Sequence, residues 1–246
     1  MPRFAANISW LFQEWDFLDR FAAARDAGFT AVECLFPYGH SIDAIANRLG
    51  DMELVLFNLA PGDFANGERG ISIFPERRAE FRAALERGLD YARALNVKRL
   101  HLMAGAAQGE VAIDCFRDAI RMTCEVMPDR DIMLEPINTR DIPGYLMSSF
   151  ALAVRLIDEL KLPNLKLQFD IYHRQMISEA PELDLRALLP ITGHVQVASP
   201  PLRREPGATE IESLRLLDTL GYKGWVSCEY GPANGTLAGL GWMKSV

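Results

Sequence analysis

"DIMLEPINTRDIPGY", residues 131–145, begins like a buried strand and ends that strand on an acid. The apolar run Ile132–Leu134 is followed at once by Glu135 and Pro136. Glutamate is depleted in strands, and a carboxylate is rarely fully buried unless it is paired or bound to a metal. Glu135 therefore has two interpretations. Either it marks the point where the strand reaches solvent, as acids at loop edges often do, or its carboxylate has a chemical role.

The pattern around this stretch repeats along the chain, because short apolar runs alternate with segments that have the period of a helix. Strands are predicted at Phe4–Ile8, Ala31–Phe36, Leu54–Asn58, Arg99–Met103, Ile132–Glu135, Leu165–Asp170, His194–Ala198 and Trp225–Glu229. Helices are predicted at Phe17–Ala27, Glu76–Leu95, Phe150–Leu160 and Glu210–Leu220, with weaker patterns around Ala112–Val126 and Leu183–Leu189. A capping box of Thr209 and Glu212 is expected to start the helix Glu210–Leu220, and Gly221 is expected to end it.

Eight predicted strands with helices between them, in 246 residues, indicate an α/β protein folded as a (β/α)8 TIM barrel. The alternative is a doubly wound open sheet, which usually carries a glycine-rich phosphate-binding turn after a strand. Neither G-x-G-x-x-G nor G-x-x-x-x-G-K-[ST] occurs in the chain. No linker or composition break divides the sequence, so we expect residues 1–246 to form a single barrel domain.

The acidic composition excludes some classes of partner. The formal net charge is −7 and the sequence pI is about 5.2, whereas a protein that binds the nucleic-acid backbone needs a basic surface. The cysteines (Cys34, Cys115, Cys124 and Cys228) form no C-x-x-C pair, and neither a signal sequence nor an apolar stretch of membrane-spanning length is visible. We expect a reduced, cytoplasmic, soluble protein that acts on a small molecule and binds no nucleic acid and no membrane. The sequence does not decide whether the protein forms a homo-oligomer.

Three later predicted strands also end in polar side chains. LKLQFD ends on Asp170, HVQVA carries Gln196 near its end, and WVSCEY carries Glu229. Starting from Glu135, the separations are 35, 26 and 33 residues, each about one βα unit, so these residues mark corresponding ends of strands five to eight. In LKLQFD the apolar residues 165, 167 and 169 form the phase that can face the helices. Asp170 then lies on the phase that points at the barrel axis.

These four strand ends predict a metal site. Barrel enzymes place their chemistry at the C-terminal mouth, where three carboxylates would repel one another unless a cation held them. Oxygen ligands suit a hard cation better than zinc. We therefore predict one divalent cation, Mg²⁺ or Mn²⁺, with the protein ligands Glu135, Asp170, Gln196 and Glu229.

Two histidines are expected beside this site. His101 lies in the strand RLHLMAG, and His173 follows Asp170 by three residues in FDIYH. We predict that both line the substrate pocket and orient oxygens without acting as the principal acid or base. A lone histidine is also commonly a hydrogen-bonded core or surface residue, and that alternative applies as well to the inward-facing His194 and to His40 in a turn.

These residues carry a resemblance that covers essentially the whole chain. The stretches LFNLAPGDFANGERGIS, LEPINTRDIPGY, LQFDIYHRQ, GHVQVA followed by RREPGATEI, and AGLGW resemble the hydroxypyruvate isomerase family, which includes the 2-oxo-tetronate isomerases, within the xylose-isomerase-like barrels. The first two stretches are long and specific. The resemblance implies one (β/α)8 barrel that binds one divalent metal through Glu135, Asp170, Gln196 and Glu229.

The resemblance also implies the reaction. It is an aldose–ketose type isomerisation of a short hydroxy-oxo acid, hydroxypyruvate or a 2-oxo-tetronate, in which Glu135 and Glu229 act as acid and base. A metal that binds both substrate oxygens would stabilise the enediolate. The substrate carboxylate calls for a cation, and Arg203 is the first candidate for this substrate-binding role, followed by Arg140 and Arg174.

The sequence departs from the family pattern in two places, which include a loop expected near the substrate. The family usually has Asp-x-Pro-Gly after HVQVA and Asn-Tyr after Glu210-Ile211, whereas this chain has Ser199–Leu202 and Glu212-Ser213.

Alternatives on the same barrel are sugar epimerases, which commonly have histidine in place of Gln196, and inosose-type dehydratases. Abasic-site endonucleases use more histidine-rich sites with several metals. A catalytically inactive ligand-binding barrel would typically have lost a ligand or one glutamate, and neither is missing here.

Overall fold

Eight parallel strands close into a barrel in sequence order, β1 to β8, in the computed structural model, which describes residues 2–177, 179 and 182–246. The strands are β1 (Arg3–Asn7), β2 (Ala31–Cys34), β3 (Glu53–Asn58), β4 (Arg99–His101), β5 (Asp131–Leu134), β6 (Leu165–Asp170), β7 (Thr192–Val197) and β8 (Trp225–Cys228). The pairing of β1 with β8, from Arg3 opposite Trp225 to Ala6 opposite Cys228, closes the ring. The predicted (β/α)8 barrel is confirmed.

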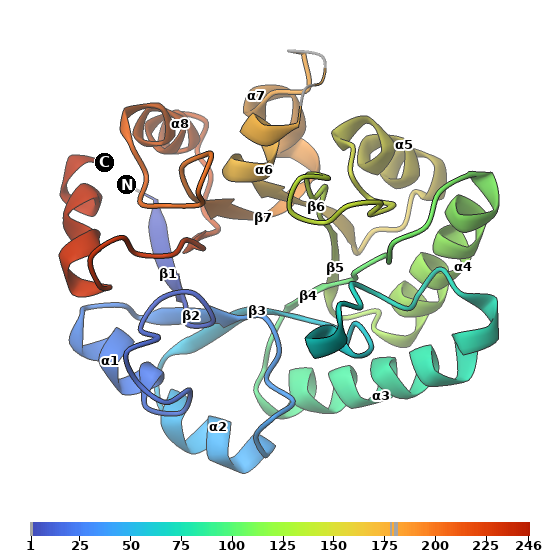
Figure 1. Cartoon of the computed structure of the whole chain (residues 1–246), viewed down its shortest axis with the longest axis horizontal. Coiled ribbons are helices and arrows are strands. Elements are labelled where there is room, and N and C mark those ends of the chain that lie inside the picture. The colour runs from blue at the N-terminus through green and yellow to red at the C-terminus, as the bar shows by residue number, and fades with distance from the viewer. Residues whose placement is uncertain (1, 178, 180–181) are drawn as a thin grey trace.

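Helices surround the barrel on all sides (Figure 1). They are α1 (Arg20–Asp26), α2 (Ile42–Leu49), α3 (Arg78–Ala94), α4 (Glu110–Val126), α5 (Phe150–Leu160), α6 (Ile171–Met176), α7 (Leu185–Leu188) and α8 (Ala208–Thr219). Four 3₁₀ segments join them, η1 (Phe64–Asn66), η2 (Pro75–Arg77), η3 (Leu189–Ile191) and η4 (Leu237–Ser245). Helix α5 has its predicted bounds, whereas α2 and α6 were not predicted because eight and six residues show too little periodicity.

The start of α8 differs from the prediction. The first turn is closed by Glu210, whose Oε2 accepts the backbone N–H of Gly207 at 2.8 Å, and not by a Thr209–Glu212 pair. The predicted box was therefore wrong by two residues, because the helix begins earlier than its apolar pattern does. Gly221 follows the end of α8 with φ 77°, and the Tyr222 N–H bonds back to the Leu217 carbonyl at 3.0 Å. This arrangement is the predicted glycine stop.

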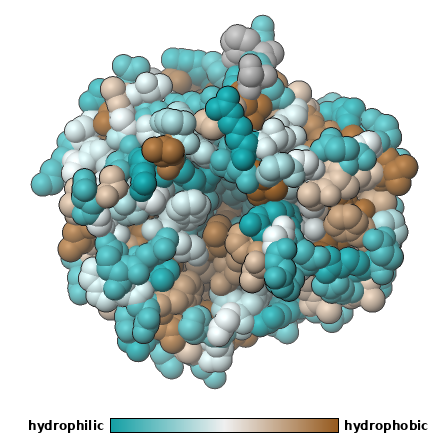
Figure 2. Space-filling view, viewed as in Figure 1, coloured by the Kyte–Doolittle hydropathy of each residue, from teal (hydrophilic) through white to brown (hydrophobic). Residues whose placement is uncertain are grey.

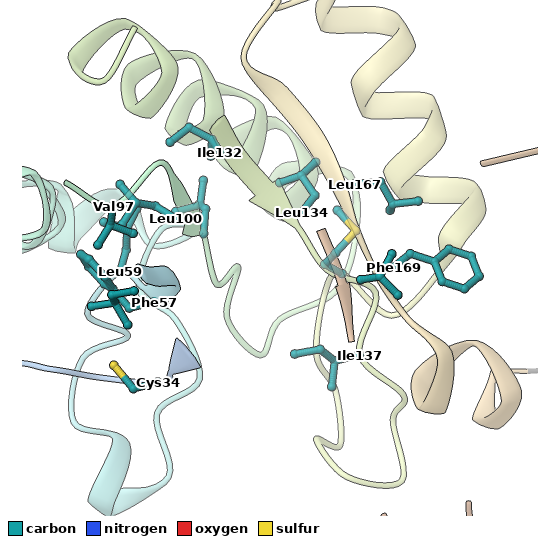
Figure 3. Close-up of a cluster of buried hydrophobic side chains, with 14 of the residues drawn as sticks. Cys34, Phe57, Leu59, Val97, Leu100, Ile132, Leu134, Ile137, Leu167 and Phe169 are labelled. Carbon is teal, nitrogen blue, oxygen red and sulfur yellow. The ribbon is translucent and has the colours of Figure 1, made fainter. Parts of the chain in front are cut away.

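The hydrophobic core lies mainly between the strands and the helices. Side chains from β3, β4, β5 and β6 form part of this layer, including Phe57, Leu100, Leu134 and Leu167 (Figure 3). Phe169 packs on Phe150 of α5 with ring centroids 5.3 Å apart. The apolar phase of β6 thus faces the helices, which leaves the alternate residues of β6 for the barrel interior.

All four cysteines are free. Within the described part of the chain, no helix combines the length and the apolar character needed to cross a bilayer.

Candidate active site

A cavity of about 290 Å³ opens at the C-terminal ends of the strands. It is lined by polar side chains from several strands and loops, among them Arg69, His101, Glu135, His173, Arg203 and Glu229. The face shown in Figure 2 is hollowed near its centre, between hydrophilic and hydrophobic residues. A larger hollow, of about 570 Å³, lies beside Asp51 and Glu53 at the N-terminal start of β3. Barrel enzymes act at the opposite end, so the smaller cavity is the candidate active site.

The two glutamates of the predicted proton-transfer pair both line this cavity. Glu135 directly follows β5 and Glu229 directly follows β8, and they are only 5% and 6% exposed. Burial raises the pKa of Glu135 well above its usual value, and the nearby charges of Glu229 and Asp170 raise it further. Burial likewise raises the pKa of Glu229, although Arg203 offsets part of this effect. Carboxylates whose pKa values are raised in a cleft are suited to exchange protons near neutral pH.

Arg203 lies among the carboxylates. Its Nη2 donates to Asp170 Oδ2 at 2.7 Å and to Glu229 Oε1 at 2.6 Å. Its Nε donates to the backbone oxygen of Glu229 at 3.1 Å. Burial would lower the pKa of Arg203, but these carboxylates raise it above its usual value, so the guanidinium stays charged. The predicted substrate-binding arginine is therefore an internal counter-ion in this state.

The loop that departs from the family pattern is what inserts Arg203. Ser199 and Arg204 exchange two backbone hydrogen bonds of 2.9 and 3.0 Å, which closes a tight turn after β7. Arg203 within this turn has φ 52°, a left-handed conformation that is costly for a residue with a side chain. Such a conformation persists only where the surroundings stabilise it, here through the ion pairs of Arg203 with Asp170 and Glu229.

The two other predicted metal ligands lie next to the glutamate pair. Asp170, at the end of β6, accepts the Tyr172 N–H at 2.9 Å through its second oxygen. Gln196, in β7, turns its Nε2 towards Glu33 at 2.6 Å and also donates to Glu229. The Oε1 of Gln196 accepts a hydrogen bond from Gln168 at 2.8 Å. A carbonyl oxygen has two lone pairs, so Oε1 keeps one for a further partner.

Both ring nitrogens of His173 face hydrogen-bond donors. Its Nδ1 lies 2.8 Å from Asn138 Nδ2 and accepts the Asn138 N–H at 3.3 Å, while the Asn138 side-chain oxygen is occupied by the Arg140 and Asp141 N–H groups. Two donors therefore face Nδ1, and Arg203 Nη1, which can only donate, lies 3.0 Å from Nε2. This Nε2 lies 3.7 Å from both Glu135 Oε1 and Asp170 Oδ2. Burial and Arg203 lower the pKa of His173, which keeps the ring neutral.

His101 is a buried polar side chain of the site whose two ring nitrogens lack hydrogen bonds. Neither ring nitrogen has a hydrogen-bond partner among the described residues, although Nδ1 lies 3.2 Å from Glu135 Oε2. Burial lowers its pKa to about 3, so the ring is neutral at physiological pH. Buried polar groups are rarely left unpaired. An imidazole that lines the cavity without a partner is available to a substrate oxygen.

The other arginine candidates lie away from the cavity. Arg174 donates to the backbone oxygens of Leu183 and Ile177, at 2.8 and 3.3 Å, and its guanidinium lies over the Phe150 ring. Arg140 is exposed on the segment after β5. The predicted inward direction of His194 is observed, because its Nε2 contacts Glu33 Oε2 at 2.6 Å inside the barrel. His40 stacks on Phe17 at 4.9 Å, away from the site.

Sequence reasoning missed a layer of polar residues below the site. Glu33 in β2 is fully buried and accepts hydrogen bonds from Asn7 at 2.9 Å, from Gln196 and from His194. Asn7 also donates to Glu229 at 2.9 Å. Burial alone would raise the pKa of Glu33, but His194 and these hydrogen bonds lower it. The signal was present, since Glu33 interrupts the apolar strand AVECLF much as Glu135 ends its own.

The donor set fits a divalent cation. The residues Glu135, Asp170 and His173 bring one ligand atom each within 4.8 Å of one another, all of them buried. Arg203 pairs with Asp170 and Glu229, and among the described residues Glu135 has no ion pair with a lysine or an arginine. Carboxylate and carboxamide oxygens are the ligands that Mg²⁺ and Mn²⁺ prefer. The chain therefore has a Glu/Asp/His cluster capable of binding a metal, beside the predicted ligands Gln196 and Glu229.

The family model for xylose isomerase-like TIM barrels matches residues 21–246, so the chain belongs to this family. Two relatives of about 40% identity are named as isomerases. The chain is 42% identical to a 2-oxo-tetronate isomerase of Cupriavidus necator, an alignment that covers 99% of this chain and 98% of the relative. It is 39% identical to a hydroxypyruvate isomerase of Escherichia coli, with 99% and 98% covered. The resemblance seen in the sequence is confirmed, and the chain is an enzyme of the isomerase type.

Solved structures show the same barrel. A Brucella melitensis protein described as an AP endonuclease of family 2 superposes with a TM-score of 0.92 at 39% identity, covering 100% of this chain and 99% of that one. An Escherichia coli 3-keto-D-glucoside 4-epimerase superposes with a TM-score of 0.78 over the full length of both chains. At 19% identity the epimerase shows the fold alone.

Proposed function

We propose that the chain is a divalent-metal-dependent isomerase of a short hydroxy-oxo acid, hydroxypyruvate or a 2-oxo-tetronate. The observation that carries the proposal is the pair Glu135 and Glu229, two buried carboxylates with raised pKa values that line one cavity. Relatives of about 40% identity with these two names support the substrate class.

The reaction requires two proton transfers. Moving a carbonyl by one carbon removes a proton from the first carbon, forms an enediolate and returns a proton to the neighbouring carbon. Glu135 and Glu229 come from β5 and β8, which are separated by β6 and β7 in the ring. One glutamate takes the proton and the other returns it, and the two exchange roles when the reaction reverses. The pKa of each carboxyl is raised above its usual value, which favours proton uptake by the glutamate that acts as the base.

The surrounding side chains hold the substrate and the cation. Glu135, Asp170, Gln196 and Glu229 would hold Mg²⁺ or Mn²⁺, and the bound cation would polarise the carbonyl and stabilise developing negative charge. His101 and His173 donate to substrate oxygens, because both rings are neutral and line the cavity.

Cleavage of abasic DNA is the competing activity, because one close structural relative is described as an AP endonuclease. The net charge of −7 and the acids at the centre of the barrel oppose it, since a DNA backbone requires cationic contacts. The test below includes this activity as a separate substrate.

The decisive experiment follows solvent deuterium in a panel of substrates. Wild-type protein loaded with Mg²⁺ or Mn²⁺ is incubated in D₂O with hydroxypyruvate, a 2-oxo-tetronate, a ketose or an abasic duplex. We expect isomerisation and deuterium incorporation with the hydroxy-oxo acids, loss of both after chelation, and no cleavage of the duplex. Glu135→Gln and Glu229→Gln should each lower turnover by a factor on the order of 10²–10⁴, the usual contribution of general acid–base catalysis.

A matched control separates chemistry from folding. Glu86→Gln replaces an exposed glutamate on α3 and should leave turnover unchanged. Isomerisation without incorporated deuterium would indicate hydride transfer or a shielded proton. Near-normal turnover in both active-site Gln variants would refute the two-glutamate mechanism, and cleavage of the duplex by wild type would favour the endonuclease.

A further inference from the structure

A hydroxy-oxo acid brings a carboxylate into a cavity that already contains acids. Glu135, Glu229 and Asp141 line this cavity, so an anionic substrate needs a cationic group there. Arg203 is poorly placed for this role, because its Nη2 and Nε are bound to Asp170 and Glu229. Its charge already offsets the acids of the site. The inference that follows rests on the proposed function, since it concerns the carboxylate of that substrate.

Arg69 is the second guanidinium that lines the cavity. It belongs to the segment between β3 and η2, within the motif LFNLAPGDFANGERGIS. Its Nη1 donates to the backbone oxygens of Phe64 and Glu68 at 3.0 and 2.8 Å, and its guanidinium carbon lies 3.9 Å from the centre of the Phe64 ring. These partners are neutral. Arg69 makes no ion pair with the residues that the structure describes, so its charge is not offset by an acid.

The segment that carries Arg69 is held firmly. The neighbouring Glu68 forms an ion pair with Arg77 of η2 and accepts the Asp63 N–H at 2.5 Å. On the other side, Gly70 has φ 127° and lies so close to the backbone of Ala104 and Gly105 that a Cβ would come within 2.6 Å of both. Only glycine fits this approach. Contacts on both sides therefore fix the position of Arg69 before any ligand binds, which reduces the entropy lost on binding.

We propose that Arg69 binds the carboxylate of the substrate and thereby makes this chain prefer 2-oxo acids to uncharged ketoses. Its guanidinium is fixed through Nη1 and the Phe64 ring, so Nε and Nη2 stay available for a planar anion. Arginine is the residue best suited to hold a carboxylate through two parallel hydrogen bonds. The Arg69 segment follows β3, whereas the glutamates follow β5 and β8. The carboxylate is thus held on a different sector of the mouth from the proton-transfer pair.

The test compares two substrates that differ only at the proposed contact. Hydroxypyruvate and dihydroxyacetone share a hydroxymethyl ketone, but the first carries a carboxylate where the second carries a hydroxymethyl group. Deuterium exchange into the shared hydroxymethyl carbon is measured for metal-loaded wild type, Arg69→Gln, Arg69→Lys and the control Arg82→Gln, which changes an exposed arginine of α3. Arg69→Gln should lower kcat/KM for hydroxypyruvate roughly 10–100-fold, as loss of a charged hydrogen-bonded contact does. It should change the rate for dihydroxyacetone by less than about 3-fold, and Arg69→Lys should restore part of the loss.

A binding measurement makes the result independent of turnover. Glycerate and glycerol form a matched pair that does not isomerise, and their affinities for metal-loaded wild type and Arg69→Gln can be measured by calorimetry. We expect wild type to bind glycerate more tightly than glycerol and Arg69→Gln to lose most of that difference. Equal losses for both substrates, no loss for either, or a glycerate preference that survives in Arg69→Gln would each overturn the proposal. Absence of turnover in wild type, together with glycerate binding that depends on Arg69, would refute the proposed isomerisation but not the anion site.

Discussion

Glu33→Gln tests whether the polar layer below the cavity supports the metal site. Glu33 is fully buried and does not line the cavity, so any functional effect must act through the residues that it contacts. Its Oε1 accepts Asn7 Nδ2 at 2.9 Å and Gln196 Nε2 at 2.6 Å, and its Oε2 lies 2.6 Å from His194 Nε2. Both Asn7 and Gln196 also donate to Glu229. Glu33 therefore orients a proposed metal ligand and, through Asn7, one member of the glutamate pair.

The contacts of Glu33 determine how much metal affinity Glu33→Gln is expected to lose. The carboxamide that Glu33→Gln introduces can keep its oxygen towards Asn7 and Gln196 and turn its NH₂ towards His194, whose ring can change tautomer to accept it. The hydrogen bonds then persist but lose their charge. Hydrogen bonds to charged groups contribute about 1.5–3 kcal/mol and neutral ones about 0.5–1.5 kcal/mol, a difference of roughly 1–1.5 kcal/mol. This difference corresponds to about a 10-fold weaker metal affinity, at the low end of the range for residues that support ligands.

The assay is a Mn²⁺ titration in which electron paramagnetic resonance measures the free ion. Wild type and Glu33→Gln are compared with the exposed control Glu86→Gln, and circular dichroism checks that each variant is folded. A second readout is the pH dependence of turnover. The Glu33 charge raises the pKa of Glu229, so its removal should move the corresponding limb of the pH profile to lower pH. Unchanged Mn²⁺ affinity and an unchanged profile in a folded Glu33→Gln protein would refute the reasoning.

Two predictions concern the cavity histidines. Burial lowers the pKa of His101 to about 3, against about 6.5 in an unfolded chain, so only the unfolded state takes up this proton between those values. The free energy of unfolding should therefore fall as the pH decreases from about 6.5 to about 3, by at most about 1.4 kcal/mol per pH unit. In urea titrations, His101→Gln should remove this part of the pH dependence. An identical pH dependence in the variant would contradict the lowered pKa of His101. His173→Asn should lower kcat/KM roughly 10-fold while deuterium exchange persists, because it removes one orienting hydrogen bond. Complete loss of exchange with metal bound and the fold intact would instead assign His173 to the chemistry.

Much of this protein could be predicted from local sequence, because strands have a simple periodicity. Side chains alternate between two faces along a strand, so Asp170 could be assigned to the barrel interior from the apolar residues beside it. The C-terminal ends of parallel barrel strands meet at one mouth. The regular spacing of Glu135, Asp170, Gln196 and Glu229 predicted that their side chains converge. In the structure all four are buried, Glu135 lies near Asp170, Gln196 donates to Glu229, and Arg203 bridges Asp170 and Glu229.

Only the tertiary structure could show what surrounds these four residues. Arg203 belongs to a loop, and a loop has no period from which the direction of a side chain can be predicted; its insertion between Asp170 and Glu229 depends on the closed turn of Ser199–Arg204. The Asn7–Glu229 hydrogen bond joins residues 222 positions apart, and it exists because closure of the barrel brings β1 beside β8. Contacts that depend on closure are set by the global arrangement of strands and not by any local pattern. For the same reason, the charge of Arg69 could be read from the sequence, but its place in the cavity could not.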